Sequence, residues 1–84
     1  MSRTTQDWQA ADAAHFLHPF TDFDALAKKG SRIIERAENI YLWDSEGHKI
    51  LDAMSGLWCG NVGYGRQELI DATTAQLKQL PFYN

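Results

Sequence analysis

The sequence contains little that could cross-link a fold or direct it to a membrane. One cysteine among 84 residues cannot form an internal disulfide, and no group of cysteines and histidines has zinc-site spacing. No apolar run approaches the length of a membrane-spanning helix, and the first residues lack the apolar core of a signal peptide. A lone thiol is typical of a reducing compartment, so the sequence predicts a cytoplasmic protein without a membrane partner.

Basic residues are also scarce. Eight lysines and arginines stand against eleven acidic residues, which gives a net charge of −3 with both signs interspersed. This balance argues against a nucleic-acid surface. The chain is 44% hydrophobic and can fold, but a domain of this length buries only about 60% of its unfolded surface. Three tryptophans, three tyrosines and four phenylalanines are many for such a chain and indicate contacts beyond it.

Glycine is sparse except between Leu51 and Gly65, a stretch that holds four of the six glycines and the only cysteine. No helical or strand period continues through residues 54–61, so an irregular loop is predicted there. Trp58 within it has two possible roles. It could form the wall of a pocket, or it could be a buried anchor that ties the loop to a core.

Two helices are predicted before this loop, at residues 4–16 and 21–29, and a third is predicted after it, at residues 66–80. Thr4 and Asp7 have capping-box spacing, and Thr21 is the expected N-cap of the second helix. Phe20, just before that cap, would then be a hydrophobic staple. We expect the first helix to pack on other parts of a larger protein rather than on the sheet described next.

Three short strands, at residues 33–37, 40–43 and 49–52, are predicted to form a small antiparallel meander. A hairpin loop with Gly47 at a position that tolerates positive φ separates the last two. Asp44 and Glu46 in this loop are interpreted as solvated residues. The residues therefore predict an α+β fold with N-terminal helices, a β-meander, a glycine-rich loop and one long helix.

No catalytic constellation can be assembled from these residues. The run from Gly60 to Gly65 matches neither a dinucleotide nor a P-loop fingerprint, and no lysine directly follows it. Cys59 has no histidine nearby in sequence and is interpreted as a small hydrophobic residue. Residue chemistry alone leaves two alternatives open, a piece that packs on something larger and a free-standing interaction module.

The order of motifs resembles the N-terminal part of class III ω-aminotransferases, above all the amine, putrescine and β-alanine:pyruvate transaminases. The resemblance covers nearly the whole chain. Gly60 departs slightly from a pattern that usually has a small aliphatic residue. The motifs are Leu-His-Pro-Phe-Thr-Asp at 17–22, Tyr-Leu-Trp-Asp at 41–44, Lys-Ile-Leu-Asp at 49–52, Gly-Leu-Trp at 56–58, Asn-Val-Gly-Tyr-Gly at 61–65 and Leu-Pro-Phe-Tyr-Asn at 80–84.

The resemblance implies a fold-type I enzyme that depends on pyridoxal 5′-phosphate and works as a homodimer with active sites at the subunit interface. The family's cofactor-binding lysine lies downstream of residue 84, and none of the four lysines here matches it. We therefore expect a fragment that is not catalytic alone. Residues 1–30 would be an N-terminal helical segment, and residues 31–84 the meander, substrate loop and helix of the small domain, without the large catalytic domain.

The resemblance also assigns residues to a substrate site. Trp58 matches the family tryptophan that lines the substrate pocket, Leu57 its neighbour, and Phe20 the aromatic that the N-terminal segment folds over the same site. This match favours the pocket-wall role of Trp58. The predicted activity is transfer of an amino group from an amine or ω-amino acid to pyruvate or a similar keto acid. The alternative is a small binding module without catalytic activity.

Overall fold

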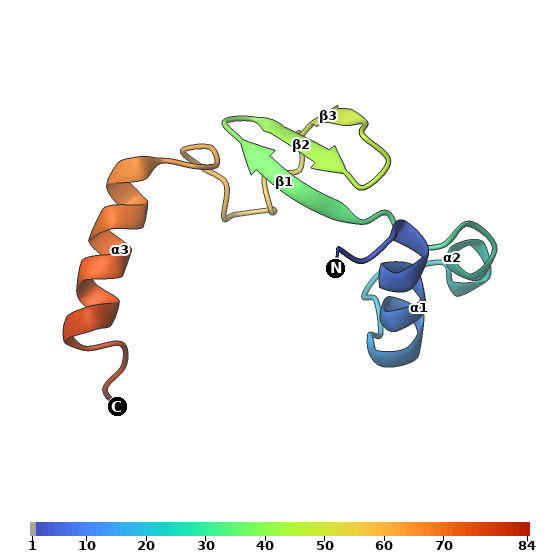
Figure 1. Ribbon diagram of the computed structural model, residues 1–84, viewed down its shortest axis with the longest axis horizontal. Helices are drawn as coiled ribbons and strands as arrows, with labels where there is room; N and C mark the ends of the chain where they lie inside the picture. The colour runs from blue at the N-terminus through green and yellow to red at the C-terminus, as the bar shows by residue number, and fades with distance from the viewer. Residues whose placement is uncertain (1) are drawn as a thin grey trace. The chain divides into compact units, whose positions relative to one another are not determined.

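The computed structural model describes residues 2–84 and confirms the predicted α+β class. Its antiparallel sheet has the strand order β1-β2-β3 (Figure 1). The chain divides into two compact units, one of residues 2–36 and 42–50 and the other of residues 37–41 and 51–84. The elements are α1 (Thr5–His15), α2 (Phe23–Lys29), β1 (Ile34–Glu38), β2 (Tyr41–Asp44), β3 (Lys49–Leu51) and α3 (Gln67–Gln79).

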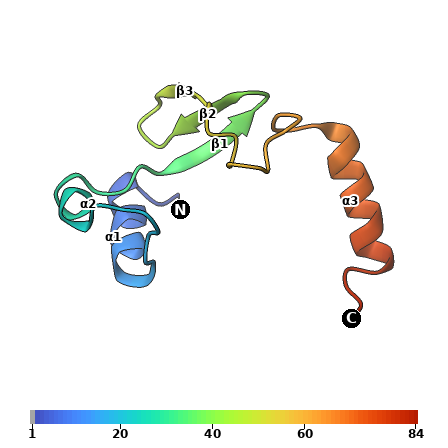
Figure 2. The ribbon, with the colours of Figure 1, turned by 180° about the vertical axis from the view of Figure 1, so that it is seen from behind.

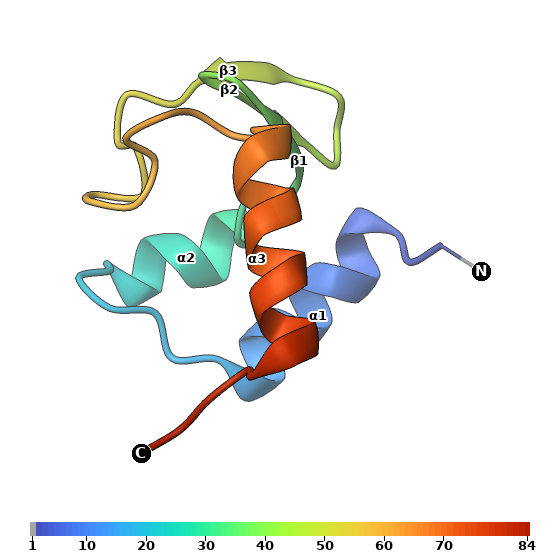
Figure 3. The ribbon, with the colours of Figure 1, turned by 90° about the vertical axis from the view of Figure 1, so that its left-hand side faces the viewer.

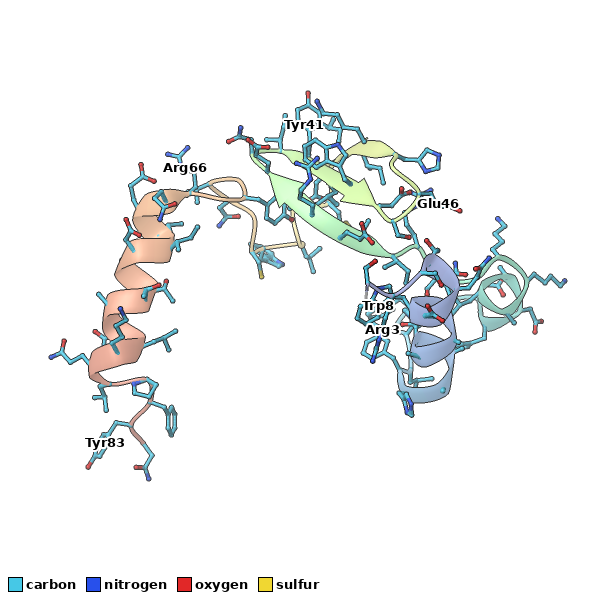
Figure 4. The ribbon with its side chains drawn as sticks, in the orientation of Figure 1. Arg3, Trp8, Tyr41, Glu46, Arg66 and Tyr83 are labelled. Carbon is cyan, nitrogen blue, oxygen red and sulfur yellow. The ribbon has the colours of Figure 1, made fainter. Side chains whose placement is uncertain are left out.

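Helix α1 begins with the predicted capping box. The Thr4 hydroxyl accepts a hydrogen bond from the Asp7 N–H at 3.2 Å, and the Asp7 carboxylate accepts one from the Thr4 N–H at 2.8 Å. Each residue thus satisfies a backbone donor that the helix leaves unpaired. The guanidinium of Arg3 lies 4.7 Å from the centre of the Trp8 ring, and the two side chains lie beside one another in Figure 4.

The expectation that α1 packs away from the meander is wrong in part. The Thr5 hydroxyl donates to the Ser45 hydroxyl in the β2–β3 turn at 2.7 Å. The Gln9 amide donates to the Ser31 carbonyl, just before β1, at 2.9 Å. Trp8 lines a shallow pocket with Ile33, Ile34 and Glu35. The prediction considered only the narrow apolar face of the helix, whereas Thr5 and Gln9, polar residues of its first turns, make the two hydrogen bonds.

Helix α2 begins at a different cap from the predicted one. The Asp22 carboxylate, not Thr21, accepts the hydrogen bond from the Ala25 N–H at 3.0 Å. An ionised carboxylate is the stronger acceptor at a helix N-terminus, where the helix dipole favours negative charge. The helix ends at Gly30 as expected, with φ of 74°. Figure 3 shows the irregular connection that joins α1 to α2.

The β2–β3 turn is organised by Asp44, which at 4% exposure is the only buried residue among residues 2–84. Its carboxylate accepts hydrogen bonds from the N–H of Glu46 at 3.1 Å, from the N–H of His48 at 2.8 Å and from the His48 ring at 2.9 Å. The interpretation of Asp44 as a solvated residue is therefore wrong. Burial alone raises the pKa of Asp44, but these hydrogen bonds outweigh it and lower that pKa.

Helix α3 ends where proline was expected to stop it, with Leu80 as its C-cap before Pro81. Its apolar residues, Leu69, Ile70, Leu77 and Leu80, are each about half exposed, between 48% and 55%. Among residues 2–84 no apolar side chain is buried. Apolar surface of this extent marks a face that packs on something else. Within the same residues, no helix combines the length and apolarity that crossing a membrane requires.

Candidate functional site

The family resemblance makes the glycine-rich loop, residues 53–63, a candidate substrate loop, and we use that name for it. The loop begins and ends at the same place in the fold. The Asp52 N–H donates to the Ile40 carbonyl at 2.8 Å. Tyr64 and Asn39 exchange two backbone hydrogen bonds, of 2.8 and 2.9 Å, in an isolated antiparallel bridge. Figure 2 shows the loop as irregular chain between β3 and α3. Both of its ends are therefore fixed beside the β1–β2 turn, within the second unit.

A left-handed turn shapes the interior of this loop. Ser55, Gly56 and Leu57 have φ values of 53°, 56° and 67° in succession. Only glycine adopts this region without cost, so two of these residues are held in an unfavourable conformation. Backbone hydrogen bonds of 2.8 Å support the turn, from the Leu57 N–H to the Met54 carbonyl and from the Gly60 N–H to the Ser55 carbonyl.

Leu57 and Trp58 lie next to one another on this turn and are 68% and 81% exposed. Trp58 is therefore not buried among the described residues, and the alternative role of an anchor would need a core supplied by chain outside them. The two residues offer adjacent exposed apolar surface on the loop. Surface of this kind can discriminate ligands by size and shape, and it supplies no acid, base or nucleophile.

Phe20 lies in the first unit, on the connection between α1 and α2. Its φ is 49° and its side chain is fully exposed, so the expected hydrophobic staple does not form. The segment before it is held by a hydrogen bond of 2.7 Å between the His18 ring and the Asp12 carboxylate. That contact lowers the pKa of Asp12. The His18 ring also meets the Phe16 ring edge-on, with centroids 4.8 Å apart.

Sequence reasoning missed one pair of residues at the base of the substrate loop. The Tyr64 hydroxyl donates to one oxygen of Asp52, and the Ser55 N–H donates to the other at 3.0 Å. The hydrogen bond to Asp52, together with burial and the charge of that carboxylate, raises the pKa of Tyr64. The i to i+3 spacing of Asp52 and Ser55 is a local signal for such a turn. Tyr64, twelve residues from Asp52, carried no such signal.

The described residues do not fit a pyridoxal phosphate site. Lys28 and Lys29 lie in the last turn of α2 and Lys78 in the last turn of α3, and all are exposed. The ammonium of Lys49 lies 5.6 Å from the centre of the Trp43 ring. Helix termini and an exposed strand do not provide the enclosed lysine on which the cofactor depends.

A second cluster, Asp44, Glu46 and His48, brings three potential ligand atoms within 4.8 Å of one another. Figure 4 labels Glu46 at this turn. Both oxygens of Asp44 already accept hydrogen bonds, and the guanidinium Nε of Arg32 lies 3.7 Å from one of them. A neighbouring cation opposes the binding of a metal ion. We interpret the cluster as the structure of the hairpin turn.

Comparison with known proteins places these features in a family. The model of the family Aminotransferase class-III matches residues 25–84. The chain is 62% identical over 80 residues to the putrescine–pyruvate aminotransferase of Pseudomonas aeruginosa. That match includes 95% of this chain but only 18% of the relative, so the chain spans less than a fifth of the relative's length.

Solved structures agree with this assignment. An omega transaminase from Pseudomonas jessenii in complex with PMP superposes with a TM-score of 0.83 at 39% identity, over 90% of this chain and 17% of that one. A thermostable omega transaminase variant, W58G, engineered for asymmetric synthesis of enantiopure bulky amines, gives a TM-score of 0.84 at 36% identity, over 92% and 17%. The match of the family model to most of the chain confirms the resemblance read from its motifs, and the chain belongs to the class-III aminotransferase family.

Proposed function

We propose that this chain is the N-terminal part of an aminotransferase that moves an amino group from an amine or ω-amino acid to pyruvate or a similar keto acid. The observation that carries the proposal is the 62% identity with a putrescine–pyruvate aminotransferase, within a class-III family match. The chain covers 18% of that relative, so the remainder of the activity would reside in chain that follows.

The cofactor we propose is pyridoxal 5′-phosphate, which supplies the electron sink for amino-group transfer when bound. A solved relative in complex with PMP supports this choice. Because the lysines here occupy helix ends and a strand, residues outside this chain would hold the cofactor. The chain alone would then be inactive, and its contribution would be to select the substrate.

The residues that we propose for this selection are Leu57, Trp58 and Phe20. Leu57 and Trp58 are adjacent exposed apolar residues on one left-handed turn, and we propose that they form an apolar wall. The family resemblance assigns Phe20 to the same site, and its full exposure leaves the ring available to a substrate. A related transaminase carrying W58G was engineered for bulky amines, which supports a tryptophan that limits substrate size. Each methylene that such a wall accepts or rejects is worth about 1–3 kcal/mol.

The apolar face of α3 is half exposed, and other large apolar residues are exposed as well. We propose that the remainder of the aminotransferase chain and a homodimer partner cover these residues. Residues 1–30 would form the N-terminal helical segment, and residues 31–84 would belong to the small domain. We place the complete enzyme in the cytoplasm, where its single cysteine in this region would remain reduced.

The test is an assay of the complete protein with pyruvate and an amine donor. Alanine formation is measured with putrescine, β-alanine and a bulky aryl amine, and the isolated residues 1–84 serve as the control. We expect alanine from the complete protein with at least one donor and none from the isolated chain. A cofactor-loaded complete protein that forms no alanine with any donor would overturn the proposal. A native gene product with the 9.5 kDa mass of this chain would favour a free-standing binding module.

A further inference from the structure

We propose that Asp52 and Tyr64 act as positioning residues that clamp the substrate loop and thereby orient Leu57 and Trp58. This inference rests on the proposed function, because it concerns how the apolar wall is held. Neither residue needs to touch a substrate in this role. Both act through the loop that they close.

A single carboxylate joins the first turn of the loop to the residue that follows the loop. Asp52 precedes the loop, Ser55 begins the left-handed turn, and Tyr64 follows the last loop residue. One Asp52 oxygen accepts the Ser55 N–H at 3.0 Å, and the other accepts the Tyr64 hydroxyl. Both oxygens of the carboxylate are therefore engaged, one by the loop and one by the residue that follows it. Hydrogen bonds to an ionised acceptor are stronger than neutral ones.

The base of the clamp is the backbone of the β1–β2 turn, to which both Asp52 and Tyr64 are hydrogen-bonded. The backbone of Asp52 is bonded to Ile40, and the backbone of Tyr64 is bonded twice to Asn39. Gly63 packs so closely against this base that a Cβ there would lie 2.9 Å from the Asn39 carbonyl oxygen. These hydrogen bonds and this close approach therefore fix the register of the two ends of the loop. The side-chain bond from Tyr64 to Asp52 adds a cross-link above this base.

Backbone hydrogen bonds support the turn of the loop, but no buried side chain adds to them within this chain. None of residues 53–63 is buried, and Met54 and Val62 are 71% and 57% exposed, like the wall residues themselves. Apolar packing therefore contributes little to its order within this chain. Segments with few buried contacts open locally at low free energy. The left-handed conformation of Ser55 and Leu57 is unfavourable, so the turn tends to relax to another backbone conformation. The hydrogen bonds of Asp52 oppose this relaxation.

The clamp is expected to persist at neutral and mildly alkaline pH. The raised pKa of Tyr64 keeps its hydroxyl protonated and able to donate under these conditions. Loss of the hydroxyl removes this donor but leaves the aromatic ring and the backbone bridge in place. Tyr64→Phe is therefore the sharpest perturbation. Asp52→Asn is a second one, because an amide retains one oxygen acceptor but not the charge.

The experiment uses the complete enzyme and two readouts. Hydrogen exchange of peptides covering residues 53–63 reports the order of the loop. The ratio of kcat/KM for a bulky aryl amine to that for putrescine reports the position of the wall. The matched controls are Tyr83→Phe, which removes an exposed hydroxyl, and Asp71→Asn, which removes an exposed carboxylate that accepts a hydrogen bond on α3.

We expect Tyr64→Phe to accelerate exchange in the loop at least about five-fold, the loss expected for one hydrogen bond. The ratio should shift toward the bulky amine, mainly through KM, and Asp52→Asn should shift it in the same direction. The control variants should change neither readout. If Tyr64→Phe folds poorly, Asp52→Asn carries the same test.

The outcomes separate this inference from the proposed function. Loop exchange in Tyr64→Phe equal to that in Tyr83→Phe would refute the clamp, whatever the activity. Faster exchange with an unchanged ratio, in an enzyme where Trp58→Ala does change the ratio, would refute positioning and leave the proposed function intact. If Trp58→Ala also leaves the ratio unchanged, positioning of a substrate wall is refuted along with the wall. A complete protein without transaminase activity would overturn the proposed function, and the exchange readout would still decide the clamp.

Discussion

Replacement of Trp58 by alanine separates a pocket wall from a structural anchor. Trp58 is 81% exposed, so only about a fifth of its side chain is covered within this chain. A fully buried aromatic covers about 150–250 Å². A fifth of that is roughly 40 Å², which at about 25 cal/mol per Å² amounts to ~1 kcal/mol for the contacts that residues 2–84 themselves supply. A core tryptophan would instead lose about 3–5 kcal/mol on replacement by alanine.

The assay is kcat/KM of the complete enzyme for putrescine and for a bulky aryl amine, measured beside a melting curve. The enlarged pocket should favour the bulky amine by at least about ten-fold relative to putrescine, because a pocket discriminates by volume. Trp8→Ala is the matched control: it removes a 41%-exposed tryptophan of α1 and should leave the ratio unchanged. An unchanged ratio in Trp58→Ala with a stability loss of about 3–5 kcal/mol would return Trp58 to the role of an anchor.

Three further predictions concern the hairpin, the loop base and the isolated chain. Folding lowers the pKa of Asp44, so the ionised carboxylate stabilises the folded protein. This stabilisation is complete above the ordinary carboxylate pKa of about 4 and is lost as pH falls through the folded pKa. Asp44→Asn should therefore flatten the acid dependence of the melting temperature. Gly63→Ala should destabilise the protein more than Gly65→Ala, because both have positive φ but only Gly63 would place a Cβ against Asn39; equal melting temperatures would contradict this. The isolated 84-residue chain should show no absorbance band of bound pyridoxal phosphate, and a band that borohydride abolishes would disprove the missing-lysine argument.

The sequence by itself determined the elements whose signals are local. The capping box of Thr4 and Asp7 formed as predicted because its two hydrogen bonds join residues one helical turn apart. Pro81 ended α3, and Gly30 and Gly47 accepted the positive φ that other residues resist. The three strands also lie within one or two residues of their predicted bounds. The order of motifs identified the family, which the comparisons confirmed.

The tertiary structure decided the features that depend on contacts between residues far apart in sequence, and those in which two neighbouring residues could serve the same role. Asp44 became buried because three donors of the folded turn replace its water, and residue type alone predicted solvation. Asp22 displaced Thr21 as the cap of α2, since two adjacent residues could serve and local spacing did not choose between them. The contact of Tyr64 with Asp52 spans twelve residues and depends on the loop's return to Asn39. No periodicity encodes that return, because backbone pairing at the β1–β2 turn creates it.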